Sequence, residues 1–157
     1  MALLHEALYV SGNFSGVDLS DYLKKLANQM LRTMVDKPGD VHLDLALLPA
    51  RVEMEQAIPC GLIVNELISN CCKHAFPDGR AGEIRIDLGY LDGGPQLALR
   101  VSDNGVGLPA DFSERRQKTL GLELVSDLAG QLGGKLTIGP GPGSVFVVTF
   151  TPKGNHE

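Results

Sequence analysis

The 157-residue sequence contains no tryptophan, and its aromatic residues are only three tyrosines and five phenylalanines. Basic residues are also few, because 14 Lys and Arg stand against 19 Asp and Glu and give a formal net charge of −5. A chain with this charge and no basic cluster is poorly suited to bind nucleic acid phosphates or anionic lipid surfaces. An anionic ligand must therefore be held by a few local groups rather than by the field of the whole molecule.

Long apolar runs and paired cysteines are scarce as well. No stretch reaches the roughly 18 apolar residues that cross a bilayer, and the N-terminal residues do not have the pattern of a signal peptide. The cysteines Cys60, Cys71 and Cys72 are odd in number and form no CxxC motif. This usage favours small buried residues in a reducing compartment over disulfides or a metal site. We therefore expect a cytoplasmic domain with no membrane segment in this chain.

What is present is the composition of a globular domain, with 43% hydrophobic and 21% charged residues. Asp18 and Ser20 are alternative caps for a first helix that runs to about residue 35, and Pro59 suits the first turn of a second helix. Hydrophobic periodicity predicts helices up to about 35, over 59–75 and over 119–132, and strands over 41–46, 83–91, 96–102, 135–139 and 144–151. This order predicts an α+β fold, an α/β sandwich in which three helices cover one face of a mixed, mostly antiparallel sheet.

The second predicted helix has two distinct faces. One face is apolar and carries Ala57, Cys60, Val64, Leu67, Ile68, Cys71 and Ala75. The opposite stripe carries Glu66, Asn70, Lys73 and His74. Such a stripe is either a solvated helix surface or a site, since an amide oxygen suits Mg²⁺, a lysine neutralises phosphate and a carboxylate can orient a nucleophile.

Two further segments carry weak signals of the same kind. Asp103 follows a strand, where a carboxylate can accept a hydrogen bond from an exocyclic amine, and Gly105 and Gly107 permit close approach of a flat ligand. Gly121 opens the third predicted helix, where free backbone N–H groups can hold phosphate. The charged stretch 112–118 is either a lid over a phosphate chain or an ordinary surface loop.

In this order the segments resemble the ATP-binding catalytic domain shared by sensor histidine kinases, DNA gyrase, Hsp90 and MutL, which has the Bergerat fold. NELISNCCKHAF resembles the N-box, DNGVGLP the G1 box and TLGLELV the G2 box, and Gly143-Ser144 resembles a late Gly-Thr/Ser element. The resemblance covers residues 19–151. Three ordered boxes are far more specific than a single glycine motif.

Two features resemble the HisKA_2-type histidine kinases in particular. The N-box has the form NEL…KHAF, and LLHEALYVSGNFSGVDLSDYL resembles the segment that joins their dimerisation helix to the catalytic domain. The absence of Trp argues against the sister HWE kinases, which resemble one another in a Trp-x-Glu element. The implied domains are 1–17, the end of a dimerisation helix and linker; 18–153, the catalytic ATP-binding domain; and 154–157, a tail.

The resemblance also implies roles for single residues. Asn70 would ligate Mg²⁺, Glu66 and Lys73 would join it in catalysis, and Asp103 would bind the adenine amino group. The implied nucleotide-binding residues are Asn70, Lys73, His74, Asp103, Gly105, Gly107, Leu108, Leu120, Gly121, Leu122 and Ser144. The implied cofactors are ATP and Mg²⁺, and the implied partners are a histidine-containing dimerisation domain and a response regulator.

The phosphoacceptor histidine of these kinases is not evident in the sequence. His5 lies in the segment that resembles the joining region and not in a phosphoacceptor motif. We therefore expect the chain to be the catalytic part of a longer kinase, which binds Mg-ATP without phosphorylating itself. The alternatives are a Ser/Thr kinase of the anti-sigma-factor type and a module that binds nucleotide without catalysis.

Overall fold

The structure is a computed structural model, and it describes residues 16–34, 41–72, 81–105, 121–139 and 143–153. Within these ranges the helices are α2 (Leu19–Met34), α3 (Met54–Asn70) and α5 (Leu122–Gln131). The strands are β1 (Val17–Asp18), β2 (Val41–Leu47), β3 (Arg51–Val52), β4 (Gly82–Tyr90), β5 (Leu97–Asp103), β6 (Lys135–Ile138) and β7 (Val145–Phe150), and a 3₁₀ turn, η3 (Leu91–Gly93), follows β4.

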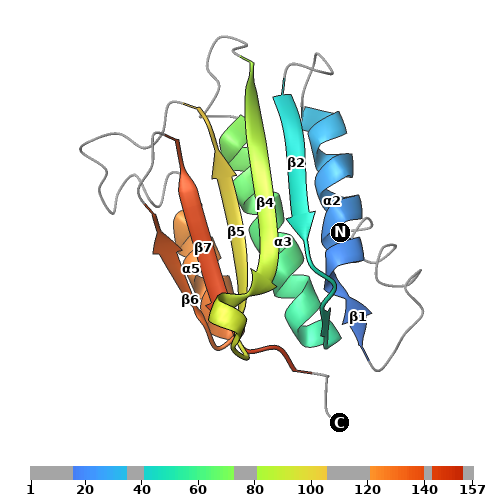
Figure 1. The fold of residues 1–157 in the computed structure, drawn as a ribbon. Coiled ribbons are helices and arrows are strands. Elements are labelled where there is room, and N and C mark those ends of the chain that lie inside the picture. The colour runs from blue at the N-terminus through green and yellow to red at the C-terminus, as the bar shows by residue number, and fades with distance from the viewer. Residues whose placement is uncertain (1–15, 35–40, 73–80, 106–120, 140–142, 154–157) are drawn as a thin grey trace.

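A five-stranded sheet forms one layer and the helices form the other (Figure 1). The strand order is β2-β4-β5-β7-β6; β2 is parallel to β4, and all other neighbours are antiparallel. The helices α2, α3 and α5 lie on the same face of the sheet (Figure 1). The predicted α/β sandwich, with a mixed, mostly antiparallel sheet and helices on one face, is confirmed.

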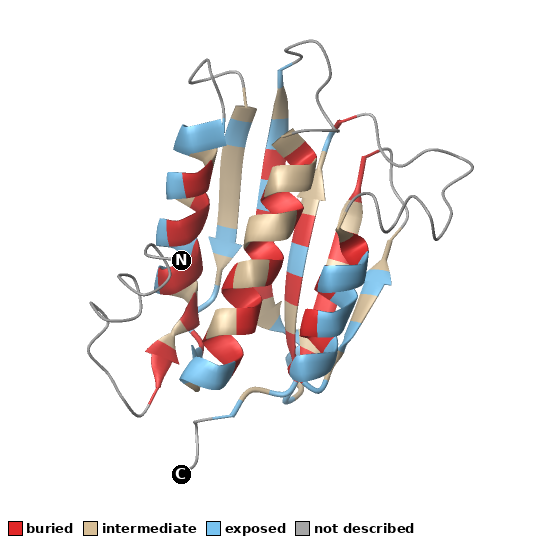
Figure 2. Cartoon of the chain, turned by 180° about the vertical axis from the view of Figure 1, so that it is seen from behind, coloured by how far each residue is buried: buried red, intermediate tan, exposed pale blue. Residues whose placement is uncertain are grey.

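The core lies between these two layers because each element buries one side. In β4 the residues Ile84, Ile86 and Leu88 are buried, whereas alternate residues of the strand point away from the helices. From the helix side, Figure 2 shows buried residues along the inner faces of all three helices. All the residues predicted for the apolar face of α3 are buried except Ala75, which lies outside the described ranges.

Helix α2 starts at a side-chain cap. The Asp18 carboxylate accepts a hydrogen bond from the Asp21 backbone N–H at 3.2 Å, so Asp18 and not Ser20 is the cap. The Ser20 hydroxyl donates to the same carboxylate oxygen at 2.8 Å. The sequence predicts one apolar side for this helix, and it is buried at Leu19, Tyr22, Leu23, Leu26 and Met30. Met34, the last residue of that side, lies at the helix end and is 38% exposed.

The prediction that α3 begins near Pro59 was wrong. The helix begins at Met54, and Pro59 lies inside it. A proline there has no N–H to donate to the carbonyl of Glu55, so one hydrogen bond of the helix is missing at this point. Pro59 itself is buried against the core.

The predicted start of the third helix at residue 119 was also wrong. Gly121 has φ +74°, a left-handed conformation that ends any helix preceding it, and α5 begins at Leu122. The other end of α5 is as predicted: Gly133 has φ +73°, and the Gly134 N–H donates to the Ala129 carbonyl at 2.9 Å.

Two connections hold distant parts of the chain and were not predicted. The two-residue strands β1 and β3 pair with each other, and they are too short to show a hydrophobic alternation. The buried Gln56 side chain donates to the Thr151 carbonyl at 2.9 Å and accepts from the Lys153 N–H at 2.7 Å. The start of α3 is thereby tied to the chain that leaves β7.

Candidate functional site

Four element ends meet at one end of the sheet. They are the C-terminal end of α3, the end of β5, the start of α5 and the start of β7, all in the upper part of Figure 1. Antiparallel pairing of β5 with β7 places Ser102 opposite Val145, so that Asp103 and Ser144 follow side by side. The fold therefore gathers segments from the three predicted boxes and the late Gly-Ser element at one place.

Asp103 is the centre of the hydrogen bonds at this end. Its Oδ1 accepts from the Gly105 backbone N–H at 2.8 Å and from the Ser144 backbone N–H at 3.3 Å. Its Oδ2 accepts from the Cys71 thiol at 3.3 Å. The carboxylate is thus held in place by α3, by its own loop and by the segment that starts β7.

Close backbone contact supports this arrangement. The Asp103 N–H donates to the Ser144 carbonyl at 3.0 Å, which extends the β5–β7 pairing by one residue. A Cβ at Gly143 would overlap the backbone carbonyl of Asp103, so only glycine fits there. The predicted Gly143-Ser144 element therefore has a packing reason for its glycine.

The next residue, Asn104, fixes the other side of the loop. Its side-chain Oδ1 accepts from the Glu83 N–H at 2.7 Å, and its own N–H donates to the Glu83 carbonyl at 3.2 Å. These two bonds tie the start of the loop to β4. Asn104 and Gly105 therefore form a bend after β5, and the hydrogen bond from the Gly105 N–H within this bend positions the Asp103 carboxylate.

Glu66 lies against the start of α5. A Cβ built on Gly121 would overlap the Glu66 carboxylate, so the two residues are in direct contact. Glu66 and Asn70, one turn apart on α3, are both half-buried rather than exposed. The stripe on α3 thus faces a neighbouring element at Glu66 and is not a fully solvated surface.

Cys71 was predicted only as a residue of the apolar face of α3, but its thiol also contacts the candidate site. It is 3% exposed, and burial, followed by the nearby Asp103 carboxylate, raises its pKa well above 9.0. The thiol therefore remains a neutral hydrogen-bond donor at neutral pH. Its apolar-face position was predictable, but its contact with Asp103 depends on the distance between the ends of α3 and β5.

The structure brings together some of the predicted site residues and leaves others undescribed. Asp103, Gly105 and Ser144 are joined by hydrogen bonds, and Glu66 is joined to Gly121 by contact. Leu122 is buried in the core at the first turn of α5. Lys73, His74, Gly107, Leu108, Leu120 and the lid candidate 112–118 lie outside the described residues.

Within the described ranges, no group of three or more His, Cys, Asp and Glu side chains is placed to hold a metal ion. Of the helices that the structure describes, none combines the length and the apolar character needed to cross a membrane.

Known proteins with similar sequences are histidine kinases. A blue-light-activated histidine kinase 2 of Erythrobacter litoralis is 28% identical over 142 residues, which is 88% of this chain and 40% of that protein. The sensor histidine kinase PdtaS of Mycobacterium tuberculosis is 31% identical over 144 residues, 87% of this chain and 27% of that protein. The chain thus spans less than half the length of these relatives.

A solved histidine kinase structure has a similar fold. The blue-light activated histidine kinase EL346 of Erythrobacter litoralis superposes with a TM-score of 0.81 at 25% identity, over 96% of this chain and 45% of that one. Residues 1–34 match the HisKA_2 family, described as histidine kinase. Residues 55–154 match the family described as histidine kinase-, DNA gyrase B- and HSP90-like ATPase. Because that match covers well over half of the 157 residues and the fold agrees, the chain belongs to this ATPase family and has its Bergerat fold.

Proposed function

We propose that this chain is the ATP-binding catalytic domain of a sensor histidine kinase, which transfers the γ-phosphoryl group of ATP to a histidine on a dimerisation domain. The observation that carries the proposal is the fixed Asp103 carboxylate within the matched ATPase region. The HisKA_2 match ahead of that region supports the histidine kinase over the anti-sigma-factor type of Ser/Thr kinase.

Adenine recognition is assigned to Asp103. Among the described residues, Oδ1 accepts two backbone N–H groups, whereas Oδ2 accepts one donor, the thiol of Cys71, and so retains an acceptor position. An exocyclic amine can donate to that position. Gly105, which donates to Oδ1, allows the backbone to lie close to a flat ring.

The described residues near the end of α3 fit a magnesium ion held largely by the nucleotide. Asn70, the last residue of α3, offers an amide oxygen, and Mg²⁺ usually takes one or two protein oxygens together with phosphate oxygens and water. When bound, the ion would neutralise phosphate charge. Lys73, the residues at the start of α5 and the rest of the predicted set would hold the same phosphates.

Glu66 is the candidate for the transfer step. Its place against Gly121, where α5 begins, puts a carboxylate beside a backbone that can hold phosphate. We assign it the orientation or deprotonation of the incoming histidine. The phosphoacceptor would lie outside residues 18–153, a response regulator would receive the group next, and the domain would work in the cytoplasm.

A titration of the chain with ATP, with and without Mg²⁺, tests nucleotide binding. Isothermal calorimetry should detect the binding of ATP to the wild-type chain. Asp103→Asn should abolish selective binding of adenine nucleotides, because the amide N–H of asparagine would face the amine of adenine where the carboxylate offers an acceptor oxygen. Asp87→Asn is the matched control, since Asp87 pairs with Arg85. Both alternate along β4 with the buried residues of that strand and so lie on the face of the sheet away from the helices. Equal ATP affinity in the Asp103 variant would place the adenine site elsewhere.

Phosphoryl transfer needs a second measurement. Glu66→Gln in the full-length kinase should keep ATP affinity and slow phosphorylation of the histidine by about 10²-fold or more. This chain alone, incubated with labelled ATP, should carry no acid-labile label. Label on His5 would contradict the assignment of the acceptor to another segment.

A further inference from the structure

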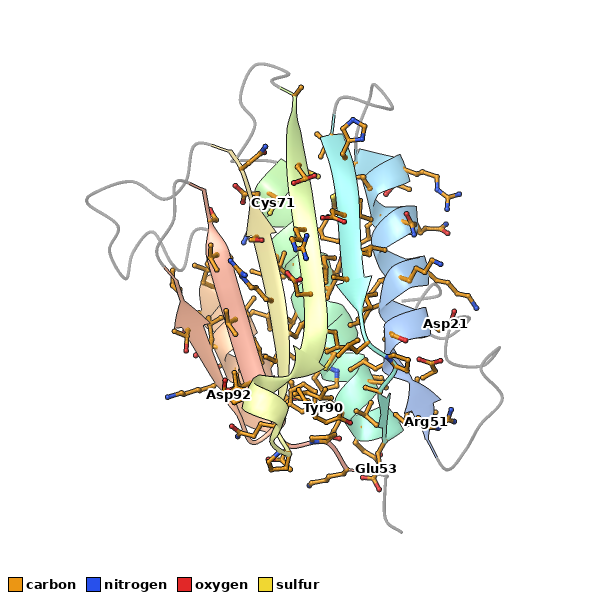
Figure 3. All side chains as sticks on the ribbon, viewed as in Figure 1. Asp21, Arg51, Glu53, Cys71, Tyr90 and Asp92 are labelled. Carbon is orange, nitrogen blue, oxygen red and sulfur yellow. The ribbon has the colours of Figure 1, made fainter. Side chains whose placement is uncertain are left out.

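The Asp103 carboxylate has different neighbours on its two oxygens. Both donors to Oδ1 are backbone N–H groups, of Gly105 and Ser144. The donor to Oδ2 is a side chain, the thiol of Cys71, at 3.3 Å. Cys71 follows the last residue of α3, at the upper end of that helix beside β5 (Figure 3).

These bonds restrict the carboxylate in different ways. The torsion that turns an aspartate carboxylate about its last single bond is broad, so donors on one oxygen leave the other oxygen some freedom. A donor on the second oxygen limits that rotation. Oδ2 is also the oxygen that retains an acceptor position for a ligand, so Cys71 acts on the oxygen that would meet the ligand.

We propose that Cys71 is a positioning residue which fixes Oδ2 of Asp103 toward the exocyclic amine of adenine and thereby increases selectivity for adenine over guanine nucleotides. This inference rests on the proposed function. Guanine presents a carbonyl oxygen where adenine presents the amine, so a fixed carboxylate oxygen attracts one base and repels the other. A carboxylate that can turn away discriminates less.

Burial suits the thiol to this task. Because Cys71 is 3% exposed and its pKa is raised, it remains protonated and continues to donate as pH rises through the physiological range. Cys72, the next residue, is half-buried and is not among the donors that the described residues give Asp103. The two adjacent cysteines therefore provide a variant and its control on one helix turn.

The test compares ATP and GTP binding by calorimetry for the wild-type chain and for Cys71→Ala, Cys71→Ser and Cys72→Ala. Cys71→Ala should lower the ratio of ATP to GTP affinity about three- to tenfold. A carboxylate that can turn attracts the amine of adenine less and repels the carbonyl oxygen of guanine less. Cys71→Ser should restore the ATP to GTP ratio to within about twofold, because a hydroxyl also donates. Cys72→Ala should match the wild type.

Thermal unfolding of each ligand-free variant separates selectivity from folding. If Cys71→Ala binds with the wild-type ATP to GTP ratio, the positioning role is refuted while the proposed function stands. The role is equally refuted if the serine variant folds but loses as much selectivity as the alanine variant. If the wild-type chain binds neither nucleotide, the proposed function and the inference fail together.

Discussion

Tyr22 is the most deeply buried polar side chain whose hydroxyl has no partner among the described residues. It is 2% exposed, and burial together with the nearby Cys60 raises its pKa. A buried hydroxyl without a hydrogen bond costs free energy that its ring burial must offset.

Tyr22→Phe should therefore leave the free energy of unfolding unchanged or raise it by about 1 kcal/mol. Urea unfolding followed by circular dichroism measures this. Tyr90→Phe is the matched control, because Tyr90 is 39% exposed, and it should have no effect. A loss of stability in the Tyr22 variant would show that the hydroxyl bonds to a group outside the described ranges.

Cys60 makes the stability of the folded chain depend on pH in the alkaline range. Burial raises the pKa of its thiol from 9.0 to about 12. Above pH 9 the unfolded chain loses this proton and the folded chain keeps it, so stability is fully present below pH 9 and falls as pH rises toward 12. The slope from one such group approaches about 1.4 kcal/mol per pH unit.

Chemical unfolding of the wild type and Cys60→Ala between pH 7 and 10.5 tests this. The alanine variant should be less stable at pH 7, because a buried side chain is shortened, but its stability should fall less steeply above pH 9. Parallel curves for the two proteins would mean that the Cys60 thiol has the same pKa in the folded and in the unfolded chain.

At the scale of elements, the backbone that joins α5 to β6 packs directly against the backbone of β7. A Cβ at Gly134 would overlap the carbonyl of Thr149, which belongs to β7. Gly134→Ala should lower the free energy of unfolding by about 2 kcal/mol or more, because backbone atoms must move.

Gly130 is the control in the same segment. It lies inside α5, and a Cβ built on it meets nothing within 4 Å. Gly130→Ala should stabilise the chain by up to about 1 kcal/mol through helix propensity. Thermal unfolding of both variants side by side checks the pair, and equal effects would contradict the close contact at Gly134.

The whole described molecule shares one hydrophobic core. The buried cluster includes residues of α2, α3, α5 and the central strands. Gln56 secures the end of the molecule opposite the site by bonding to Thr151 and Lys153. A single core predicts that the two ends unfold together.

Unfolding with and without Mg-ATP tests whether the two ends unfold together. Since the chain has no tryptophan, fluorescence reports its three tyrosines, Tyr9, Tyr22 and Tyr90, while circular dichroism reports the backbone. Both signals should give the same midpoint, and Mg-ATP should shift both midpoints equally. At a ligand concentration of 100 Kd the free energy of unfolding should rise by about 2.7 kcal/mol. Two separate midpoints would contradict the single core.

The sequence by itself determined the fold class, the order of the three helices and of the five strands of the main sheet, and the candidate site segments. Hydrophobic periodicity and three ordered boxes are local patterns. It also determined that one face of α3 is apolar, from Ala57 to Cys71. The predicted starts of α3 and α5 were wrong. Pro59 lies inside a helix, and the residue type of Gly121 does not fix its backbone conformation.

Only the tertiary structure decided which groups meet. The pairing of β1 with β3, the Gln56 bonds and the overlap that excludes a side chain at Gly143 all join segments far apart in the chain. The same holds for the Cys71 thiol, which reads as core on its helix and becomes a donor to Asp103 only because α3 and β5 end side by side. Local patterns fix the faces of elements, whereas contacts between their ends depend on distances that packing alone sets.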